Sequence, residues 1–328
     1  MSFNQTMETA ADLAAVAALL EIAEELGVSA LLDRAEPFTL DDLAGAGGVP
    51  EEGAAGLLEA LLAAGLVERT GDPQQFLPCA DMADRRYESG YLSWALNANR
   101  PFVENAPEFL RDPDGAAEKY HRDGRRVAVS SRWMGSMGAY PAALSTILEC
   151  RPERLADLGA GAGALVINVL RKLPASSGAL LDMSAAACEE ATRAAARADV
   201  DDRLQVVNRR IESLVDDPSP VEGADLIHAG FVMHDVAADP EMFDAVLRSC
   251  RAAMKRTGRL IVSDAIPYAT DPRERKFSAL FTYLHVAFMG VRLPTEEQWT
   301  AAFRAAGFTD VTATELRFPT GRIFVATV

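Results

Sequence analysis

Hydrophobic and polar residues follow a helical spacing through the first part of the chain. In residues 7–26 apolar side chains recur at every third or fourth position with glutamates between them, which predicts an amphipathic helix. Residues 39–42 have the form of a capping box and predict the start of another helix. The leucine pattern of residues 50–64 predicts a third helix, and residues 66–69 predict a strand that leads into a turn at residues 71–73.

A different pattern begins near residue 155, where short apolar runs alternate with helical spacing. The expected elements are, in order, strand 155–158, helix 165–170, strand 179–182, helix 185–198, strand 204–207, strand 224–229, helix 240–254, strand 259–264, helix 296–306 and a closing hairpin from 311 to 328. This alternation predicts a doubly wound α/β sheet with an antiparallel C-terminal edge. We therefore expect two domains, residues 1–95 and residues 96–328.

The order helix, helix, helix, hairpin in the first domain is that of a winged helix, which often binds DNA. The expected recognition helix, residues 50–60, contains no lysine or arginine that could meet a phosphate or a guanine. The formal net charge of −16 also disfavours nucleic acid and anionic membranes as partners. We therefore predict that this apolar module mediates dimerisation and that the protein is a homodimer.

Cysteines and the first residues of the chain bear on its cellular compartment. Cys79, Cys150, Cys188 and Cys250 are far apart and form no C-x-x-C pair, which predicts reduced thiols. Residues 1–8 lack the basic and apolar regions of a signal peptide, and no apolar run reaches membrane-spanning length. These features favour a cytoplasmic protein.

A glycine-rich turn follows the first expected strand of the α/β part. Asp157 precedes Gly159, Gly161 and Gly163, and a helical pattern begins directly after them. Glycines let the backbone approach a nucleotide-like ligand closely, and the helix behind them offers free N–H groups. The turn also fits the dinucleotide pattern through Ala164, and an alternative is a small-residue turn with no ligand. Asp157 favours S-adenosylmethionine over a dinucleotide. Its carboxylate would face the negative charge of a dinucleotide's pyrophosphate, whereas it suits the ammonium group of S-adenosylmethionine.

A second carboxylate lies at the end of the next expected strand. Asp182 comes about twenty residues after the glycines, the distance at which a carboxylate reaches ribose hydroxyls. It is a further candidate for cofactor binding.

Taken together, five segments in this order resemble the class I S-adenosylmethionine methyltransferases, specifically the small-molecule O-methyltransferase-like family. They are 157–163, Asp182, Phe231–Asp235, the region from Thr257 to Pro267, and 295–308. The resemblance implies a Rossmann-like doubly wound α/β sheet with an N-terminal helical winged-helix dimerisation domain. It places adenine contacts in segment 208–212, so that Arg210 and Ile211 become candidate cofactor residues, although this segment departs from the usual family pattern.

The catalytic side departs from the same family. The resemblance implies that His234 takes a proton from a hydroxyl group and that a glutamate orients it. At the position of that glutamate this chain has Leu293, so we expect the base to lack its partner. His285, meanwhile, lies on the expected helix 277–288 where an apolar residue is usual.

Two histidines near one pocket suggest a metal site. His234, Asp235 and His285 look like the metal ligands of the 2-oxo acid C-methyltransferases of the phenylpyruvate C-methyltransferase type, in which iron or zinc holds the oxo acid. His234 and Asp235 would then be the catalytic residues. Asp235 can ligate only if the chain is already turning there, and otherwise orients His234. Core packing is the alternative for His285, and His121 and His228 are expected to be solvated or structural.

The resemblance thus predicts an S-adenosylmethionine-dependent enzyme that methylates C3 of a metal-chelated 2-oxo acid through its enolate, toward β-methyl amino acids of antibiotics. One alternative is an O-methyltransferase of a phenolic or hydroxylated metabolite with His234 as an unaided base. Another is a dimeric binding protein that has lost its chemistry. Trp133, Met137, Tyr283 and Met289 are candidates for the substrate cavity.

Overall fold

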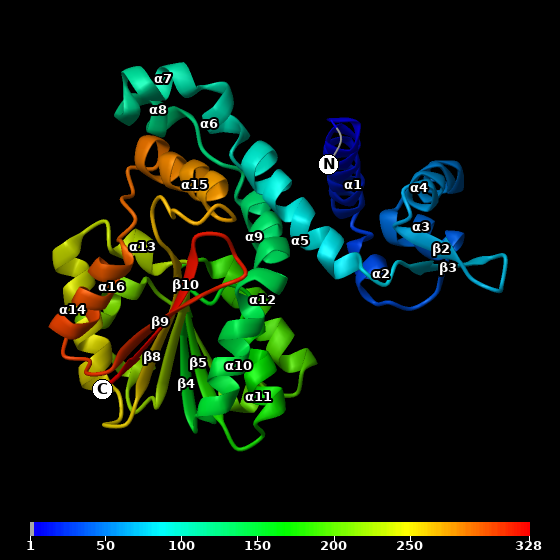
Figure 1. Cartoon of the computed structure of the whole chain (residues 1–328). Helices are drawn as coiled ribbons and strands as arrows, with labels where there is room; N and C mark the ends of the chain where they lie inside the picture. Colours follow the sequence, from blue (N-terminus) through cyan, green and yellow to red (C-terminus); the bar gives the residue numbers. More distant parts are fainter. Residues whose placement is uncertain (1–2) are drawn as a thin grey trace. The chain divides into compact units, whose positions relative to one another are not determined.

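The computed structural model describes residues 3–328, with side chains from residue 9 onward. The chain forms two compact units, one that ends at Met137 and one that covers Gly138–Val328 (Figure 1). The predicted boundary at residues 95/96 lies within the helical stretch Ser93–Ala98, and the division into two domains at that point stays a prediction.

Unit 1 is mostly helical and contains one small sheet. Its elements are α1 (Phe3–Glu25), α2 (Ser29–Asp33), β1 (Phe38–Thr39), α3 (Leu40–Gly47), α4 (Glu51–Ala63), β2 (Val67–Arg69), β3 (Gln75–Pro78), α5 (Met82–Leu92), the π-helix η1 (Ser93–Ala98), α6 (Arg100–Glu104), α7 (Ala106–Arg111), α8 (Pro113–Lys119) and α9 (Gly124–Gly138). The sheet has the order β1-β3-β2, and both pairings are antiparallel.

Local sequence signals set the helix ends of unit 1 as expected. The Thr39 side chain accepts a hydrogen bond from the backbone N–H of Asp42, and the Asp42 carboxylate accepts one from the backbone of Thr39, so the predicted capping box begins α3. Gly27 has a φ of +75° directly after α1, a conformation that glycine adopts at little cost. The winged-helix and dimerisation interpretation stays a prediction.

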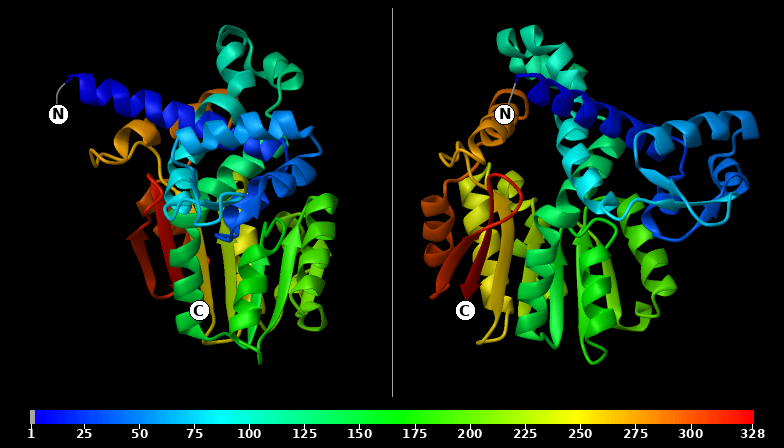
Figure 2. Two further views of the ribbon diagram at one scale, coloured as in Figure 1. Left: turned by 90° about the vertical axis from the view of Figure 1, so that its right-hand side faces the viewer. Right: turned by 45° about the vertical axis from the view of Figure 1, so that its right-hand side comes forward.

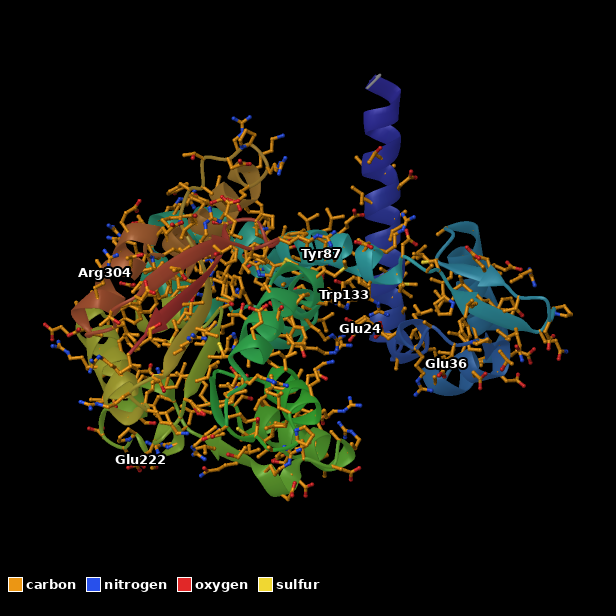
Figure 3. The ribbon with its side chains drawn as sticks, turned by 60° about the horizontal axis from the view of Figure 1, so that its bottom comes forward. Glu24, Glu36, Tyr87, Trp133, Glu222 and Arg304 are labelled. Carbon is orange, nitrogen blue, oxygen red and sulfur yellow. The ribbon has the colours of Figure 1, made fainter. Side chains whose placement is uncertain are left out.

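Helix α5 packs on the first helix of unit 1, and α9 packs on α5. α5 contacts α1, and it lies so close to α9 that a Cβ added at Gly90 would approach Met134 Cγ to 2.8 Å. Trp133 of α9, labelled in Figure 3, is 2% exposed, and the guanidinium of Arg86 lies 5.6 Å from its ring centroid. Trp133 is therefore part of the unit 1 core.

Unit 2 is a seven-stranded α/β structure. Its elements are α10 (Tyr140–Cys150), β4 (Arg154–Leu158), α11 (Ala164–Lys172), β5 (Ser177–Asp182), α12 (Ala185–Arg197), η2 (Asp201–Arg203), β6 (Leu204–Asn208), η3 (Ile211–Val215), η4 (Ser219–Val221), β7 (Leu226–Gly230), α13 (Met233–Val236), α14 (Pro240–Ala253), β8 (Arg259–Ala265), α15 (Arg275–Phe288), α16 (Glu296–Ala305), β9 (Val311–Glu315) and β10 (Gly321–Thr327). The strand order is β6-β5-β4-β7-β8-β10-β9.

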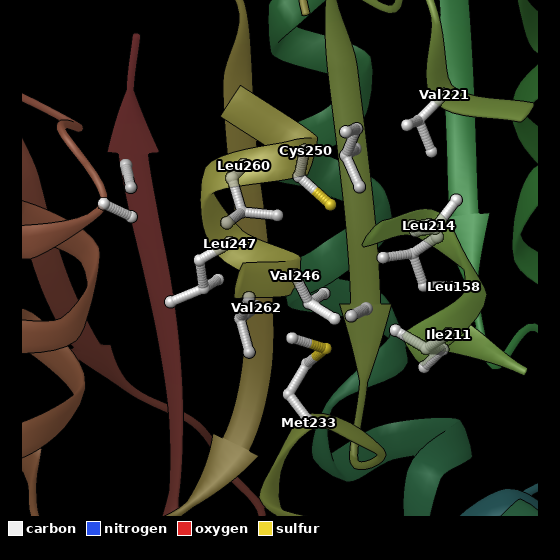
Figure 4. Close-up of a cluster of buried hydrophobic side chains, with 14 of the residues drawn as sticks. Leu158, Ile211, Leu214, Val221, Met233, Val246, Leu247, Cys250, Leu260 and Val262 are labelled. Carbon is white, nitrogen blue, oxygen red and sulfur yellow. The ribbon is translucent and has the colours of Figure 1, made fainter. Parts of the chain in front are cut away.

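The sheet is doubly wound, as the sequence predicted. Strands β6, β5, β4, β7 and β8 are parallel, whereas β10 runs antiparallel between β8 and β9. Figures 1 and 2 show α11 and α12 on one face of this sheet and α14 and α16 on the other. On the α14 face, side chains such as Leu158, Val246 and Val262 form one buried apolar cluster (Figure 4). This core fixes the parallel strands and thereby the edge at which they end.

Two further expectations concern thiols and membranes. The cysteines at positions 79, 150, 188 and 250 are all free thiols, which agrees with the prediction of reduced cysteines. No helix in the described part of the chain combines the length and the apolar character needed to cross a membrane. The prediction about a signal peptide depends in part on residues 1 and 2, which lie outside the described residues.

Candidate active site

The parallel strands of unit 2 bring their carboxyl ends to one edge of the sheet. In such sheets ligands bind beyond this edge, at the point where the strand order reverses. Here the order reverses between β4 and β7. Strands β5 and β6 lie on one side of β4, and strands β7 and β8 lie on its other side. Each residue predicted to bind the cofactor or a metal, except His285, lies near the end of one of these strands or in the segment that follows it.

The glycine turn after β4 has the geometry that its sequence predicts. Gly159 and Gly161 have φ values of +64° and +55°, and the backbone N–H of Gly159 donates to Leu181 O of the neighbouring strand. A Cβ at Gly159 would come within 2.6 Å of Val232, whereas a Cβ at Gly161 would meet nothing within 4 Å. Gly159 is thus required for packing, and Gly161 faces open space where a ligand could approach the backbone.

The carboxylate of Asp182 stabilises this turn through hydrogen bonds. Its Oδ2 accepts a hydrogen bond from Gly161 N at 2.8 Å, and its Oδ1 accepts one from Ser184 N at 2.8 Å. A carboxylate has about four acceptor sites, so these bonds leave acceptor capacity for ribose hydroxyls. The tertiary structure therefore places the two predicted cofactor segments, the turn and Asp182, in direct contact.

The segment after β6 lies beside Asp182. Arg209 N and Asn208 Nδ2 both donate to the backbone carbonyl of Asp182. Ile211 is 9% exposed and packs in the core, while Arg210 is exposed and forms an ion pair with Glu212 at 2.6 Å. The cofactor roles of Arg210 and Ile211 stay predictions.

Asp157 is buried below the turn and has a partner that the sequence did not suggest. Its Oδ1 lies 2.7 Å from Nδ1 of His228, which occupies the facing position on β7. The two residues are 3% and 5% exposed. His228 thus lies beside a buried carboxylate, and its expected structural role stays a prediction.

His234 lies in α13, a single helical turn that follows β7. Its Nδ1 lies 2.7 Å from Oδ1 of Asp264, and its backbone N–H donates to Asp264 Oδ2 at 3.1 Å. Asp264 is the penultimate residue of β8 and is 0% exposed. Because a carboxylate only accepts hydrogen bonds, Nδ1 carries the proton and Nε2 is the basic nitrogen.

This contact corrects the expectation that the base lacks a partner. Leu293 is 2% exposed and packs as an apolar residue, but Asp264 supplies the orienting carboxylate from another strand. The sequence does contain a signal for it, since Asp264 is an acidic residue at the carboxyl end of an apolar strand. Its pairing with His234 becomes visible only when β7 and β8 are known to be neighbours.

The two predicted histidines of the metal site do meet. The rings of His234 and His285 lie edge to face with centroids 5.2 Å apart, and His285 Nδ1 donates to the Phe281 carbonyl at 2.7 Å. The Asp235 side chain is 67% exposed, and its Oδ1 lies 3.6 Å from His234 Nε2.

The predicted three-residue metal centre is therefore not assembled. Among the side chains that the structure describes, residues 9–328, no three His, Cys, Asp or Glu are grouped in a way that could hold a metal ion. The chain does turn at His234, as ligation by Asp235 would require, but the carboxylate that orients this histidine is Asp264.

An aromatic cluster lies next to His285. Phe281 lies 4.2 Å from the His285 ring centroid, and Phe231, at a φ of +54° after β7, contacts Phe318 at 4.7 Å between ring centroids. Tyr283, a predicted cavity residue, is instead 44% exposed. An aromatic side chain thus lies against His285, while the described neighbours of His234 include His285 and the carboxylates of Asp264 and Asp235.

Comparisons with known proteins agree with this geometry. The chain is 30% identical to aclacinomycin 10-hydroxylase of Streptomyces purpurascens, over 46% of the chain and 38% of that protein. It is 25% identical to a mitomycin biosynthesis 6-O-methyltransferase of Streptomyces lavendulae, over 88% of the chain and 84% of that protein. It thus spans under two fifths of the hydroxylase but most of the methyltransferase.

The fold is also that of solved methyltransferases. The crystal structure of human N-acetylserotonin methyltransferase in complex with SAM superposes with a TM-score of 0.64 at 16% identity, covering 100% of this chain and 98% of that one. The family model of the O-methyltransferase domain matches the sequence of residues 143–309. This range contains the glycine turn, Asp182, His234 and Asp264. On the strength of that match, the chain belongs to the O-methyltransferase domain family.

Proposed function

We propose that the protein is an S-adenosylmethionine-dependent O-methyltransferase that acts on a hydroxyl group of a small aromatic metabolite. The observation that carries this proposal is the His234–Asp264 pair, in which a buried carboxylate holds the imidazole at 2.7 Å. Such a pair is an oriented general base. The mitomycin 6-O-methyltransferase, similar over most of its length, supports the same class of reaction.

The glycine turn and its neighbours suit the cofactor. Gly161 leaves open space at the backbone, Asp182 retains acceptor capacity for ribose hydroxyls, and Asp157 offers a carboxylate to an ammonium group. When bound, S-adenosylmethionine would supply an electrophilic methyl group, and its sulfur would keep the electron pair of the broken carbon–sulfur bond.

His234 would remove the proton of the accepting hydroxyl. The Asp264 carboxylate fixes Nδ1–H, so Nε2 accepts the proton as the hydroxyl oxygen bonds to the methyl carbon. The same carboxylate stabilises the imidazolium that results. A phenol, with a pKa of about 10, is within reach of such a base. Aromatic side chains around the histidines, such as Phe281, would favour a planar apolar substrate.

Methylation at C3 of a 2-oxo acid is the second candidate. One observation favours it, namely that the imidazoles of His234 and His285 are neighbours and that each Nδ1 is held by an oxygen acceptor. Metal-binding histidines are usually oriented in this way. We place it second because Asp235 is turned to solvent and the donor set is incomplete.

Methyl transfer from labelled S-adenosylmethionine to phenols and to 2-oxo acids, with and without a chelator, separates the two candidates. We expect chelator-insensitive methylation of a phenol, and less than a tenfold loss in His285→Ala. Exposed His121→Ala is the matched control. One equivalent of iron or zinc, with loss of 2-oxo acid methylation in His285→Ala, would favour the second candidate and contradict the first.

We further propose that unit 1 mediates homodimerisation. Two large apolar side chains of this unit, Ile22 on α1 and Leu96 on η1, are 48% and 61% exposed, and such surface is stabilised by burial against a second copy. Sedimentation velocity at micromolar concentration should show a dimer that Ile22→Glu weakens. Val215→Glu, at a 40% exposed position of unit 2, should leave it intact. A wild-type monomer would contradict the proposal.

A further inference from the structure

Asp157 and His228 form a second buried pair of carboxylate and imidazole, apart from the catalytic one. Their side chains are 4% and 6% exposed, and the 2.7 Å contact joins Asp157 Oδ1 to His228 Nδ1. A carboxylate at this depth loses most of its hydration and stays ionised only if hydrogen-bond donors replace the water. The Nδ1–H group of His228 is such a donor.

The other nitrogen of His228 indicates that the imidazole is neutral. Nε2 is buried, and within the described residues it has no hydrogen-bond partner. Gly230 lies beside this ring, since a Cβ there would be 3.2 Å from His228 Cε1 and 3.8 Å from Nε2, and glycine has no side chain to supply an acceptor. A protonated ring would bury an unsatisfied N–H group, which is costly, whereas a bare lone pair costs less.

A neutral histidine beside an ionised carboxylate leaves the pair with one net negative charge. The carboxylate is two residues before the glycine turn. Burial raises the pKa of the Tyr140 hydroxyl, and the charge of the Asp157 carboxylate raises it further. That hydroxyl donates to Ala164 O at 3.3 Å, at the first residue of α11. The charge therefore lies directly under the turn, where a cationic group of a ligand would be stabilised.

We propose that His228 is a positioning residue for cofactor binding, holding Asp157 ionised and oriented so that the pair binds the ammonium of the cofactor's amino-acid end. This inference rests on the proposed function, because that function supplies the ligand. It assigns a role to His228 beyond packing. Without the imidazole donor, the Asp157 carboxylate would lose the hydrogen bond that orients it, and its attraction for an ammonium would be weakened.

The test compares two ligands in calorimetry. S-adenosylhomocysteine carries the amino-acid end, and 5′-methylthioadenosine lacks it. We expect His228→Phe to weaken S-adenosylhomocysteine binding by about tenfold or more, the size of one charge-assisted hydrogen bond, and to change methylthioadenosine binding by less than about twofold. His228→Asn, which keeps an N–H donor near the position of Nδ1, should retain most of the affinity. His121→Phe, at an exposed site, is the control.

Asp157→Asn keeps the shape and removes the charge, so it should lower the preference for S-adenosylhomocysteine even if His228→Phe fails to fold. Equal affinity of both ligands for the wild-type protein, or an unchanged preference in Asp157→Asn, would overturn the role of His228 alone. Failure of the wild-type protein to bind either ligand would overturn the proposed function, and this inference with it.

Discussion

Asp264→Asn is expected to lower kcat for methyl transfer by about 10²–10⁴-fold, the usual contribution of a positioned general base. Three N–H groups converge on this carboxylate: His234 N, His234 Nδ1–H and Ala265 N. The amide introduced by Asp264→Asn would have one oxygen in place of two and could not accept all three hydrogen bonds. Its NH₂ group would donate to Nδ1 of His234, which favours the tautomer in which Nε2 of His234 carries the proton. That tautomer cannot take a proton from the substrate. His234→Ala should cause a loss of similar size.

The controls for this experiment are Asp235→Asn and a thermal melt of each variant. Asp235 is the adjacent carboxylate but is 67% exposed, so its loss should change kcat by less than about threefold. S-adenosylhomocysteine should bind Asp264→Asn as it binds the wild type, since Asp264 does not touch the glycine turn. Full activity in a folded Asp264→Asn protein would contradict His234 as the base.

Gly161→Val is expected to abolish measurable cofactor binding in calorimetry while the protein stays folded. The added side chain would enter the open space above the turn, and a β-branched residue at a φ of +55° also strains the backbone. The strain costs about 1–2 kcal/mol, and the steric block is the larger effect on binding.

Gly223→Val separates strain from blockage. Gly223 also has a positive φ, +69°, and a Cβ there would meet nothing within 4 Å, but it lies in the loop before β7 and far in sequence from the turn. We expect both variants to lose similar stability and only Gly161→Val to lose cofactor affinity. Equal binding by the two variants would show that the cofactor does not approach Gly161.

Much of this protein can be predicted from its sequence because the signals are local. The capping box at Thr39, the glycine turn after Leu158 and the apolar strand runs each depend on neighbouring residues, and all three form as expected. Asp182 was predictable too, since a carboxylate at the end of the next strand necessarily lies beside the turn in a parallel sheet.

The hydrogen-bond partners of His234 and Asp157 could not be predicted, because each partner lies on or after a different strand. His234 and Asp264 are thirty residues apart, and His228 and Asp157 seventy-one, and only the order β4-β7-β8 brings each pair within 2.7 Å. Leu293, at the position of the family's orienting glutamate, therefore suggested that His234 lacks a partner and binds a metal. In the structure the Asp264 carboxylate of the neighbouring strand is that partner. The sequence alone determined the elements and the cofactor turn. The tertiary structure decided which charges face each other, because hydrogen bonding between side chains depends on distance in space and not along the chain.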